Sequence, residues 1–328
     1  MAAVLWCGGE DIDFPNGAAT PVSTNSAYFR TGYARCAVGN VAGTNTTSAR
    51  SLSFVGGGVT SCWLHAYCAP LALMSSSVYI GLGLNSAAQV AIAIGTSTAS
   101  ASKTALWLFS SGSWTQLATE TGASLGATQT LDMNVQSFGA SATVTVYVNG
   151  VSVISYSGST TVTGVASLDC VCLVGGSNYG YISEIVVTDT LDTRSMSLLT
   201  GAPNAVGDTN NWTAGTYANI NPTSINDTSV ISVNTTVADF QANVTDLPAG
   251  TFSVNAVKVS ARAEVTAGAV PTGIKLGVRI SAVNYLDTAH TLTAAFAPYE
   301  RLMTTNPATS AAWAQSDINP LQLALESA

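Results

Sequence analysis

The stretch "SATVTVYVNGVSVISYSG", Ser141 to Gly158, decides the fold class of this chain. Valine occupies every second position from 144 to 148, and the alternation resumes at Val151 after the pair Asn149-Gly150. A side-chain period of two is typical of a strand with one buried face, and an Asn-Gly pair accepts the positive φ angles of a two-residue turn. The stretch therefore predicts an antiparallel β-hairpin.

The chain on either side of this hairpin has the same character. No long apolar stripe repeats at the three-to-four spacing of a helix, and Gly recurs every few residues. Short, regularly spaced strands favour an antiparallel sandwich over a parallel sheet, so we predict an all-β protein. The further predicted strands are "SCWLHAYC" (61–68), "SVYIGLGL" (77–84), "QVAIAIG" (89–95), "TALWLFSS" (104–111), "QTLDMNVQSF" (129–138), "SLDCVCLVG" (167–175) and "YISEIVVTD" (181–189).

A second β region follows a break in the pattern. Alternation lapses between Thr190 and Gly215, where turn residues cluster. It returns in "AVKVSARAEV" (256–265) and "GIKLGVRISAV" (273–283), each with one apolar and one polar face. We therefore predict two domains, residues 1–192 and a smaller β-sandwich of residues 193–328, with the boundary near Asp192 to Gly201.

Charge is scarce. Charged residues make up 9% of the 328 residues, the formal net charge is -8, and no basic run occurs. Without such a run the chain lacks an electrostatic footprint for phosphate backbones, so we expect no nucleic-acid binding. The second region does carry Arg194, Arg262, Arg279 and Arg301, which we expect to be solvated or to contact acidic neighbours.

Mean hydropathy is +0.33, which raises the question of a membrane segment. The longest weakly polar stretch, residues 62–74, is broken by His65 and Pro70 and is too short to span a bilayer. The first fifteen residues have no basic region followed by an apolar one. We expect no membrane insertion and synthesis in a cytoplasm.

Residues 1–192 resemble a laminin-G-like, concanavalin-type jelly roll. The likeness rests on the aromatic strand "CWLHAY" (62–67), the hairpin "YVNGVSV" (147–153) and the closing strand "YISEIVV" (181–187). The resemblance implies that the closing strand pairs with an opening strand near "WCGGEDIDF" (6–14). This fold hosts lectins, glycan hydrolases and structural modules, so it does not name a function.

Two further stretches resemble modules of tailed-bacteriophage virion proteins. The first runs through an Asp-Thr-Arg step at 192–194 and a "GD-x-x-x-W" step at 207–212. The second is "NPATSAAWAQSDINPLQLALES" (306–327), close to a pattern "NPATG-x-x-WT-x-x-DIN-x-LQ-x-G". Ser310, Ala314 and Ala324 stand where Gly, Thr and Gly are usual, which affects the local turn geometry.

This ending predicts a final turn and strand. Pro307 would stiffen the entry turn, Trp313 would bury a large apolar surface, and Asp317 or Asn319 would bond to nearby backbone. An arbitrary polar tail is the alternative, but disordered tails seldom carry a Trp and a Leu-Gln-Leu run.

The residues that catalysis requires are few. His65 lies inside a predicted strand, His290 follows a turn, and neither belongs to a metal-binding helix motif. The densest acid cluster is Glu10, Asp11 and Asp13, whose order does not match the alternating acids of glycosidases on this fold. Asp11 and Asp13 would share a strand face, which leaves open a calcium site or acids that are solvated on an edge strand or cap a turn. We expect no enzyme, no cofactor and no resident metal.

Cysteine usage leaves three alternatives. Cys62 and Cys68 are an even number of residues apart, as are Cys170 and Cys172, so each pair faces one way in a regular strand. Buried thiols that act as small hydrophobes are favoured, with late disulfides second. A four-Cys zinc site is the third, although C-x-x-C knuckles are missing. The full set is Cys7, Cys36, Cys62, Cys68, Cys170 and Cys172.

Aromatic residues and one glycine-rich loop are the candidates for ligand contact. Trp107, Trp114 and Tyr179 lie where a lectin could use them, although most such tryptophans belong to a core. In "GGSNYGY" (175–181), glycines give access to the backbone and Asn178 and Tyr179 offer donors and a ring. The loop reads equally well as a hairpin turn. Its predicted contact residues are Gly175, Gly176, Asn178 and Tyr179.

These observations favour a non-enzymatic structural component on the exterior of a tailed-phage particle: a head decoration, a collar or neck component or a tail fibre. It would be made in the host cytoplasm and reside in the virion. Its partners would be other virion proteins and copies of itself, which we expect to form a homotrimer. The smaller domain would dock or oligomerise, and the jelly roll would be displayed. The alternative function is a carbohydrate-binding adhesin that contacts host surface glycans.

Overall fold

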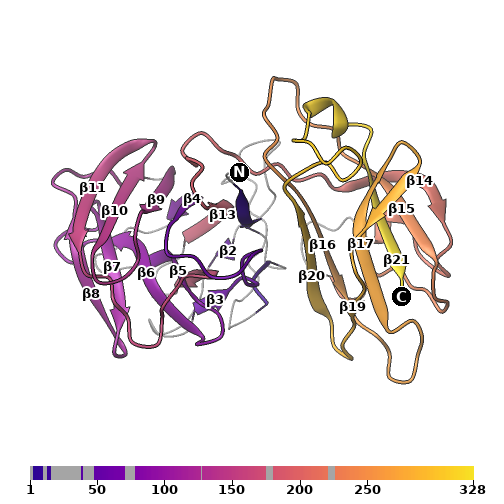
Figure 1. The fold of residues 1–328 in the computed structure, drawn as a ribbon, viewed down its shortest axis with the longest axis horizontal. Coiled ribbons are helices and arrows are strands. Elements are labelled where there is room, and N and C mark those ends of the chain that lie inside the picture. The colour runs from indigo at the N-terminus through magenta and orange to yellow at the C-terminus, as the bar shows by residue number, and fades with distance from the viewer. Residues whose placement is uncertain are drawn as a thin grey trace. The chain divides into compact units, whose positions relative to one another are not determined.

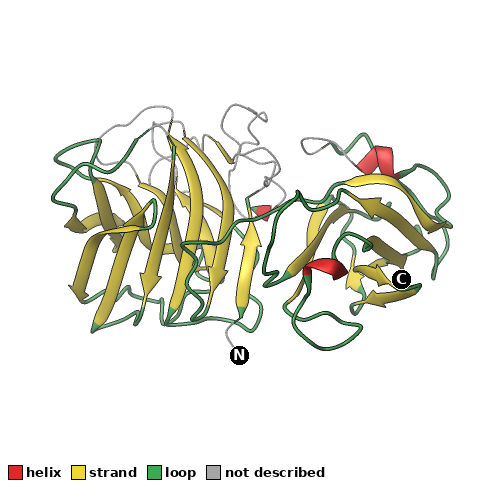
Figure 2. Ribbon diagram, turned by 90° about the horizontal axis from the view of Figure 1, so that it is seen from above, coloured by secondary structure: helices red, strands yellow, loops and turns green. Residues whose placement is uncertain are grey.

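The structure of the chain is a computed structural model. It describes residues 3–9, 13–15, 38–39, 48–70, 78–126, 128–174, 180–220 and 226–328. The chain divides into two compact units, Met1–Leu198 and Leu199–Ala328. Figure 2 shows that strands and loops make up both units, with a few short helical turns. The all-β prediction is confirmed.

The first unit is a jelly-roll sandwich of two antiparallel sheets, called sheet I and sheet II (Figure 1). Sheet I has the order β1 (Val4–Gly8), β13 (Gly180–Thr188), β4 (Cys62–Pro70), β9 (Gln129–Val135), β10 (Ala142–Val148) and β11 (Val151–Gly158), and β2 (Val38–Gly39) also pairs with β13. Sheet II has the order β3 (Ser48–Arg50), β12 (Cys170–Val174), β5 (Val78–Leu84), β6 (Gln89–Thr96), β7 (Thr104–Ser110) and β8 (Ser113–Thr119).

Both sequence-predicted pairings in this unit are present. The hairpin β10–β11 turns at Asn149 and Gly150, whose φ angles are 50° and 77°, as a two-residue turn between twisted strands requires. The closing strand β13 pairs antiparallel with the opening strand β1, with Cys7 opposite Val186. The jelly roll is thus closed by strands from the two ends of the unit.

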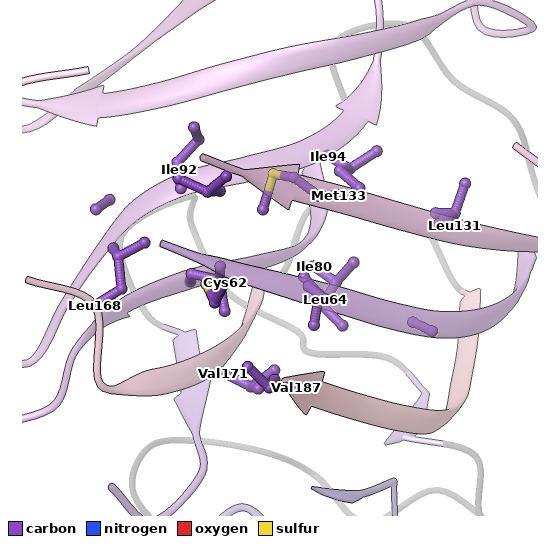
Figure 3. Packing of buried hydrophobic residues seen from close by; sticks show 14 of the residues in the cluster. Cys62, Leu64, Ile80, Ile92, Ile94, Leu131, Met133, Leu168, Val171 and Val187 are labelled. Atoms are coloured by element: carbon purple, nitrogen blue, oxygen red, sulfur yellow. The ribbon is translucent and has the colours of Figure 1, made fainter. Parts of the chain in front are cut away.

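The main core of the first unit lies between the two sheets (Figure 3). Leu64, Leu131 and Met133 reach it from sheet I, and Ile80 and Ile92 from sheet II, all with no exposed surface. A second apolar cluster covers the other face of sheet II, called here the outer face of sheet II. Its residues alternate with core residues along each strand: Val78, Val90, Ala93, Ala105, Trp107, Cys170, Cys172 and Val174. Sheet II is therefore apolar on both faces.

The second unit is a smaller antiparallel sandwich with sheets III and IV. Sheet III has the order β14 (Pro203–Asn210), β15 (Asp239–Val244), β21 (Gln322–Ser327), β17 (Gly273–Ile280) and β18 (Val283–Leu286), and β19 (His290–Thr291) pairs with β17. Sheet IV consists of β16 (Val257–Ala263) and β20 (Ala297–Met303). Short 3-10 turns η3 (Tyr217–Ile220) and η4 (Gln315–Asp317) complete the unit. No helix among the described residues combines the length and the apolar character needed to cross a membrane.

The last strand, β21, lies inside sheet III between β15 and β17. Phe240, Leu276, Val278 and Leu325 form the centre of the core of this unit. The two units divide between Leu198 and Leu199, inside the interval from Asp192 to Gly201 that the sequence indicates. Residues 189–194 pack on the first unit, as described next.

Candidate functional site

The loop predicted to contact a ligand lies outside the described residues. Gly175, Gly176, Asn178 and Tyr179 all fall in the gap between Val174 and Gly180. The strands on either side, β12 and β13, belong to sheets II and I. Both predictions for this loop, a ligand contact and a hairpin turn, therefore fall outside the described residues and stay predictions.

The two candidate tryptophans of the outer face of sheet II differ in exposure. Trp107 is 4% exposed, and its indole N–H donates a hydrogen bond of 3.0 Å to the carbonyl oxygen of Thr96. This ring is part of the fold. Trp114 on β8 is only half-buried, and its ring centroid lies 5.1 Å from that of Phe109, also half-buried, at an interplanar angle of 56°. Phe109 and Trp114 are called here the aromatic ledge.

The aromatic ledge follows from the geometry of the β7–β8 hairpin. Phe109 and Trp114 are directly opposite each other in the register. The turn between them places Ser111 at φ 53° and Gly112 at φ 78°. Both rings pack on the buried cluster of the outer face of sheet II, which supports them from below. A rigid hairpin on a packed base thus presents two partly exposed rings.

Polar groups surround the ledge. Ser111 and Ser113 at the turn are exposed. Gln116, two residues after Trp114 and therefore on the same face of β8, is opposite Trp107. Its Oε1 accepts a hydrogen bond of 2.9 Å from the backbone N–H of Thr98, which orients the carboxamide. Apolar rings beside an oriented amide and hydroxyls suit a ligand with both C–H and O–H faces.

Residues Asp189 to Arg194, called here the strap, cross the outer face of sheet I. Asp189 Oδ1 accepts a hydrogen bond of 2.8 Å from the backbone N–H of Ala3. Thr193 Oγ1 donates one of 2.9 Å to Asp132 Oδ1 on β9. Local sequence patterns carry no sign of this contact, because Thr193 and Asp132 are far apart in the chain. The strap explains why the first unit extends beyond Asp192.

Under the strap lies a buried His–Asp pair. His65 Nδ1 is 2.7 Å from Asp132 Oδ1, and neither side chain has exposed surface. His65 Nε2 has no hydrogen-bond partner among the described residues. The hydroxyl of Thr193 bonds to the aspartate and not to the imidazole, so the three residues are not arranged as nucleophile, base and orienter. The pair fastens the strap to the sheet.

A second aromatic pair is already occupied by the chain itself. Trp63 and Tyr147 are stacked, with centroids 5.6 Å apart and an interplanar angle of 22°. The guanidinium of Arg194 lies 4.7 Å from the ring centroid of Tyr147 and 5.8 Å from that of Trp63. Asp192 holds this guanidinium, and the hydrogen bond to Arg194 keeps the pKa of Asp192 below its ordinary value. This pair therefore stabilises the strap.

The predicted acid cluster is not a solvated strand face at Asp13. Strand β1 ends at Gly8, and Asp13 is 3% exposed with its Oδ2 accepting a hydrogen bond of 2.8 Å from the backbone N–H of Gly9. The prediction of a solvated edge-strand face is therefore wrong for this residue. Glu10 and Asp11 lie outside the described residues. Within the described ranges, no group of three or more His, Cys, Asp or Glu residues could hold a metal ion.

Cys62, Cys68, Cys170 and Cys172 are free and buried, Cys7 is also buried, and Cys36 lies outside the described residues. Cys62 and Cys68 belong to the core between the sheets, whereas Cys170 and Cys172 belong to the outer face of sheet II. These two pairs lie on opposite faces of sheet II, so the alternative of one four-Cys zinc site is wrong for them. Burial raises the pKa of Cys62 and of Cys68 to about 12. Cys170 Sγ lies 3.8 Å from Cys172 Sγ.

The cations of the second unit are engaged within the chain. Arg262 pairs with Asp227 and Arg279 with Asp208, each at 2.8 Å. Arg301 donates to the carbonyl oxygens of Leu276 and Tyr285, and burial lowers the pKa of its guanidinium. The prediction of contacts with acidic neighbours is confirmed for Arg262 and Arg279, whose neighbours belong to the same unit.

The second histidine also has an acidic partner. His290 Nε2 lies 2.7 Å from Asp287 Oδ2, and both side chains are partly exposed. Asp287 Oδ1 accepts a hydrogen bond of 2.7 Å from the backbone N–H of Leu276. This pair joins the start of β19 to strand β17.

The C-terminal signature serves the fold as the sequence predicts. Trp313 is 5% exposed, and its indole N–H donates to the carbonyl oxygen of Met303 at 2.9 Å. Asp317 Oδ2 accepts from the backbone N–H of Ala314, and Asn319 Oδ1 accepts from that of Leu247. The turn that begins at Asn306 leads into the helical turn η4 and then into β21.

Sequence reasoning identified Trp114 as a candidate but missed its partner Phe109. The signal was present, because Phe109 and Trp114 flank the turn "SSGS" (110–113) symmetrically. Predicting a hairpin whose turn contains Gly112 would have placed the two rings opposite each other.

No protein-family model matches the chain, and no curated protein matches it. Domain 4 of the extracellular arabinanase AbnA from Geobacillus stearothermophilus, solved with arabinotriose, is 20% identical over 48% of this chain and 70% of that chain, with a TM-score of 0.29. The carbohydrate-binding module CBM66 from Bacillus subtilis is 10% identical over 42% of this chain and 79% of that chain, with a TM-score of 0.26. Botulinum neurotoxin type C is 11% identical over 53% of this chain and 45% of that chain, with a TM-score of 0.34. The cell entry of that toxin depends on interaction with two ganglioside molecules.

Proposed function

We propose that this protein is a non-enzymatic carbohydrate-binding protein, in which the jelly-roll unit holds a sugar ring on the aromatic ledge. The observation that carries the proposal is the half-buried pair Phe109 and Trp114, 5.1 Å apart at a hairpin with an oriented carboxamide beside it. The ligand would be a glycan on a host surface. The second unit would dock the protein to its carrier.

The chemistry of the ledge matches that of a sugar. A pyranose or furanose ring has faces of C–H groups that pack on aromatic rings and an edge of hydroxyls that need hydrogen-bond partners. Phe109 and Trp114 supply rings, and the carboxamide of Gln116 supplies a donor and an acceptor. Trp63 and Tyr147 do not compete for such a ligand, because Arg194 covers them.

The non-enzymatic part of the proposal is supported by how three of the four buried acids among the described residues, Asp13, Glu120 and Asp132, are used. Asp13 accepts from Gly9, and Glu120 Oε1 accepts from the backbone N–H groups of Thr104 and Ser124. Asp132 accepts from Thr193 and contacts His65. Carboxylates committed to fixing the backbone or another side chain are ill suited to proton transfer in a reaction.

A glycan array tests the binding function. We expect the full chain to bind a defined subset of glycans, and Trp114→Ala to weaken that binding about tenfold or more, because a truncated aromatic anchor commonly costs over 1.4 kcal/mol. Phe296→Ala is the matched control, since Phe296 is another half-buried ring that lies under Arg262 in the second unit.

Other outcomes of the array are informative. Loss of binding in Asn178→Ala or Tyr179→Ala, with Trp114→Ala unaffected, would move the sugar to the 175–179 loop and contradict the ledge. Binding of no glycan would contradict the function itself. Polysaccharide turnover that disappears on changing Glu10, Asp11 or Asp13 would contradict the non-enzymatic proposal.

A second candidate function is that of a structural component on the exterior of a tailed-phage particle. It is favoured by the resemblance of residues 306–327 to virion modules, and these residues build the turn and the inner strand of sheet III. Stiff sandwiches with few charges would then pack into a symmetric assembly. A cryo-EM map of the particle that carries the chain would show this unit seated on its neighbours. A particle lacking the chain would contradict this candidate.

A further inference from the structure

Most edge strands of the described sheets have features that oppose pairing with another chain. An open edge presents unpaired N–H and C=O groups, and proteins protect it with charges, prolines, bulges or short length. In sheet III, β14 begins at Pro203, carries Asp208 and has two register shifts, and β18 spans only Val283–Leu286. In sheet IV, β16 carries Lys258 and Arg262.

Three edge strands of the first unit, β3, β1 and β8, each have at least one feature that opposes pairing with another chain. Strand β3 has three residues and carries Arg50. Strand β1 is five residues long and buried throughout. Strand β8 is free of charge, but its pairing with β7 shifts register in the middle, between Leu106 and Trp107.

Strand β11 is the least protected, because its one register shift lies at the hairpin end of the strand. It runs for eight residues, "VSVISYSG", with no charge and no proline. After one register shift near the hairpin turn, Ile154 to Gly158 pair with β10 without interruption. Ser152, Ser155 and Ser157 are exposed, and Val151 is 65% exposed. Within the described residues, β11 pairs with β10 alone, so its other side is the open edge of sheet I.

We propose that β11 pairs antiparallel with β11 of a second copy of this chain, which joins the two copies of sheet I into one continuous sheet. A second copy is the occupant that the composition favours. Like charges that face each other across a twofold axis repel, and an uncharged strand rich in Val, Ile, Tyr and Ser avoids that cost. The resulting assembly is a twofold dimer, not the homotrimer expected from the sequence.

The test is the mass of the full chain in solution, measured by light scattering or sedimentation across a concentration series. We expect a species of twice the chain mass of 33.3 kDa. A variant with Ser152, Ser155 and Ser157 all changed to Lys should be monomeric, and so should the corresponding triple Glu variant. An equimolar mixture of the two should recover the dimer, because opposite charges then face each other in any antiparallel register.

A matched control places the same charge elsewhere. This control is a triple variant in which Ser86, Thr121 and Ala123, all at exposed loop positions, are changed to Lys. It should leave the dimer unchanged. A wild-type monomer or trimer at every concentration would overturn the proposal. It would also be overturned if both triple variants stayed dimeric, or if the mixture stayed monomeric while circular dichroism showed both variants folded.

Discussion

Ser310 adopts the left-handed backbone region, with φ 58°, in the turn that follows Asn306. A side chain in this region costs free energy because its Cβ approaches the neighbouring carbonyl oxygen. We expect Ser310→Gly to raise the free energy of unfolding by about 0.5–1 kcal/mol. This figure is the strain that glycine removes, less the cost of the greater chain entropy that glycine has in the unfolded state.

Chemical denaturation of the full chain measures this change. Ser310→Ala is the control, because alanine keeps the Cβ and therefore the strain, and it should give no increase. A glycine variant no more stable than the alanine variant would show that the turn is not strained.

The buried thiols give a second prediction for single residues. The thiolate is the reactive form of cysteine, and burial raises the pKa of Cys62 and Cys68 to about 12. The contact with Cys172 and burial also raise the pKa of Cys170. We expect iodoacetamide to modify these residues in the folded protein at least about a hundredfold more slowly than in denaturant, as followed by peptide mass spectrometry. Rapid labelling of Cys62 or Cys170 in native buffer would contradict the packing described here.

At the scale of elements, the hairpin could be predicted from local sequence patterns, whereas the pairing of β1 with β13 was implied by the resemblance to a jelly roll. Asn149 and Gly150 encode the turn locally, and alternation of valines encodes which face of the strand is buried. The end of β1 and the burial of Asp13 could not, because no local pattern shows that Gly9 supplies its partner.

The candidate site residues also divide into those that local sequence predicts and those that it does not. Trp114 was identified from its residue type and position, whereas its partner required the register of the β7–β8 hairpin. The strap was missed for a different reason. Thr193 and Arg194 find their partners, Asp132 and Tyr147, only after the sheet has formed. Contacts of this kind depend on the fold as a whole, so local periodicity does not record them.

The strap also makes stability depend on pH. Burial raises the pKa of Asp189, but hydrogen bonds from the backbone N–H groups of Ala3 and Thr190 outweigh it and hold the pKa below the ordinary value of 3.8. A carboxyl with a depressed pKa in the folded state stabilises the fold above its unfolded pKa, and the contribution is lost as the pH falls through and below that value.

We therefore expect the free energy of unfolding of the wild type to fall more steeply between about pH 5 and about pH 3 than that of Asp189→Asn. Urea denaturation at several pH values measures both slopes. Parallel slopes for the two proteins would mean that Asp189 does not fasten the strap.

At the scale of the whole molecule, each unit has its own core and can be tested by itself. The strap belongs to the first unit, so a fragment ending at Leu198 keeps Thr193 and Arg194, while one ending at Asp192 loses both. We expect the longer fragment to be more stable by about 1–3 kcal/mol, the worth of the hydrogen bond from Thr193 to the buried carboxylate of Asp132. Thermal or urea unfolding of the two fragments gives the difference. Equal stability would contradict the assignment of the strap to this unit.

Few charges over a large β surface leave hydroxyls and amides to interact with water, and the described part of the first unit follows this rule. Serines face outward along β11, and the aromatic ledge is bordered by serines and Gln116. A surface of this composition is suited to polar, uncharged ligands and to copies of itself. Both proposals made above draw on that property, and they use different edges of the jelly roll.

The most direct test of the account is a crystal structure of the full chain with the oligosaccharide that binds best on the array. The account predicts one sugar ring packed on Trp114 and Phe109, with a hydroxyl within hydrogen-bond distance of Gln116. A sugar bound at another place with the ledge empty would contradict it.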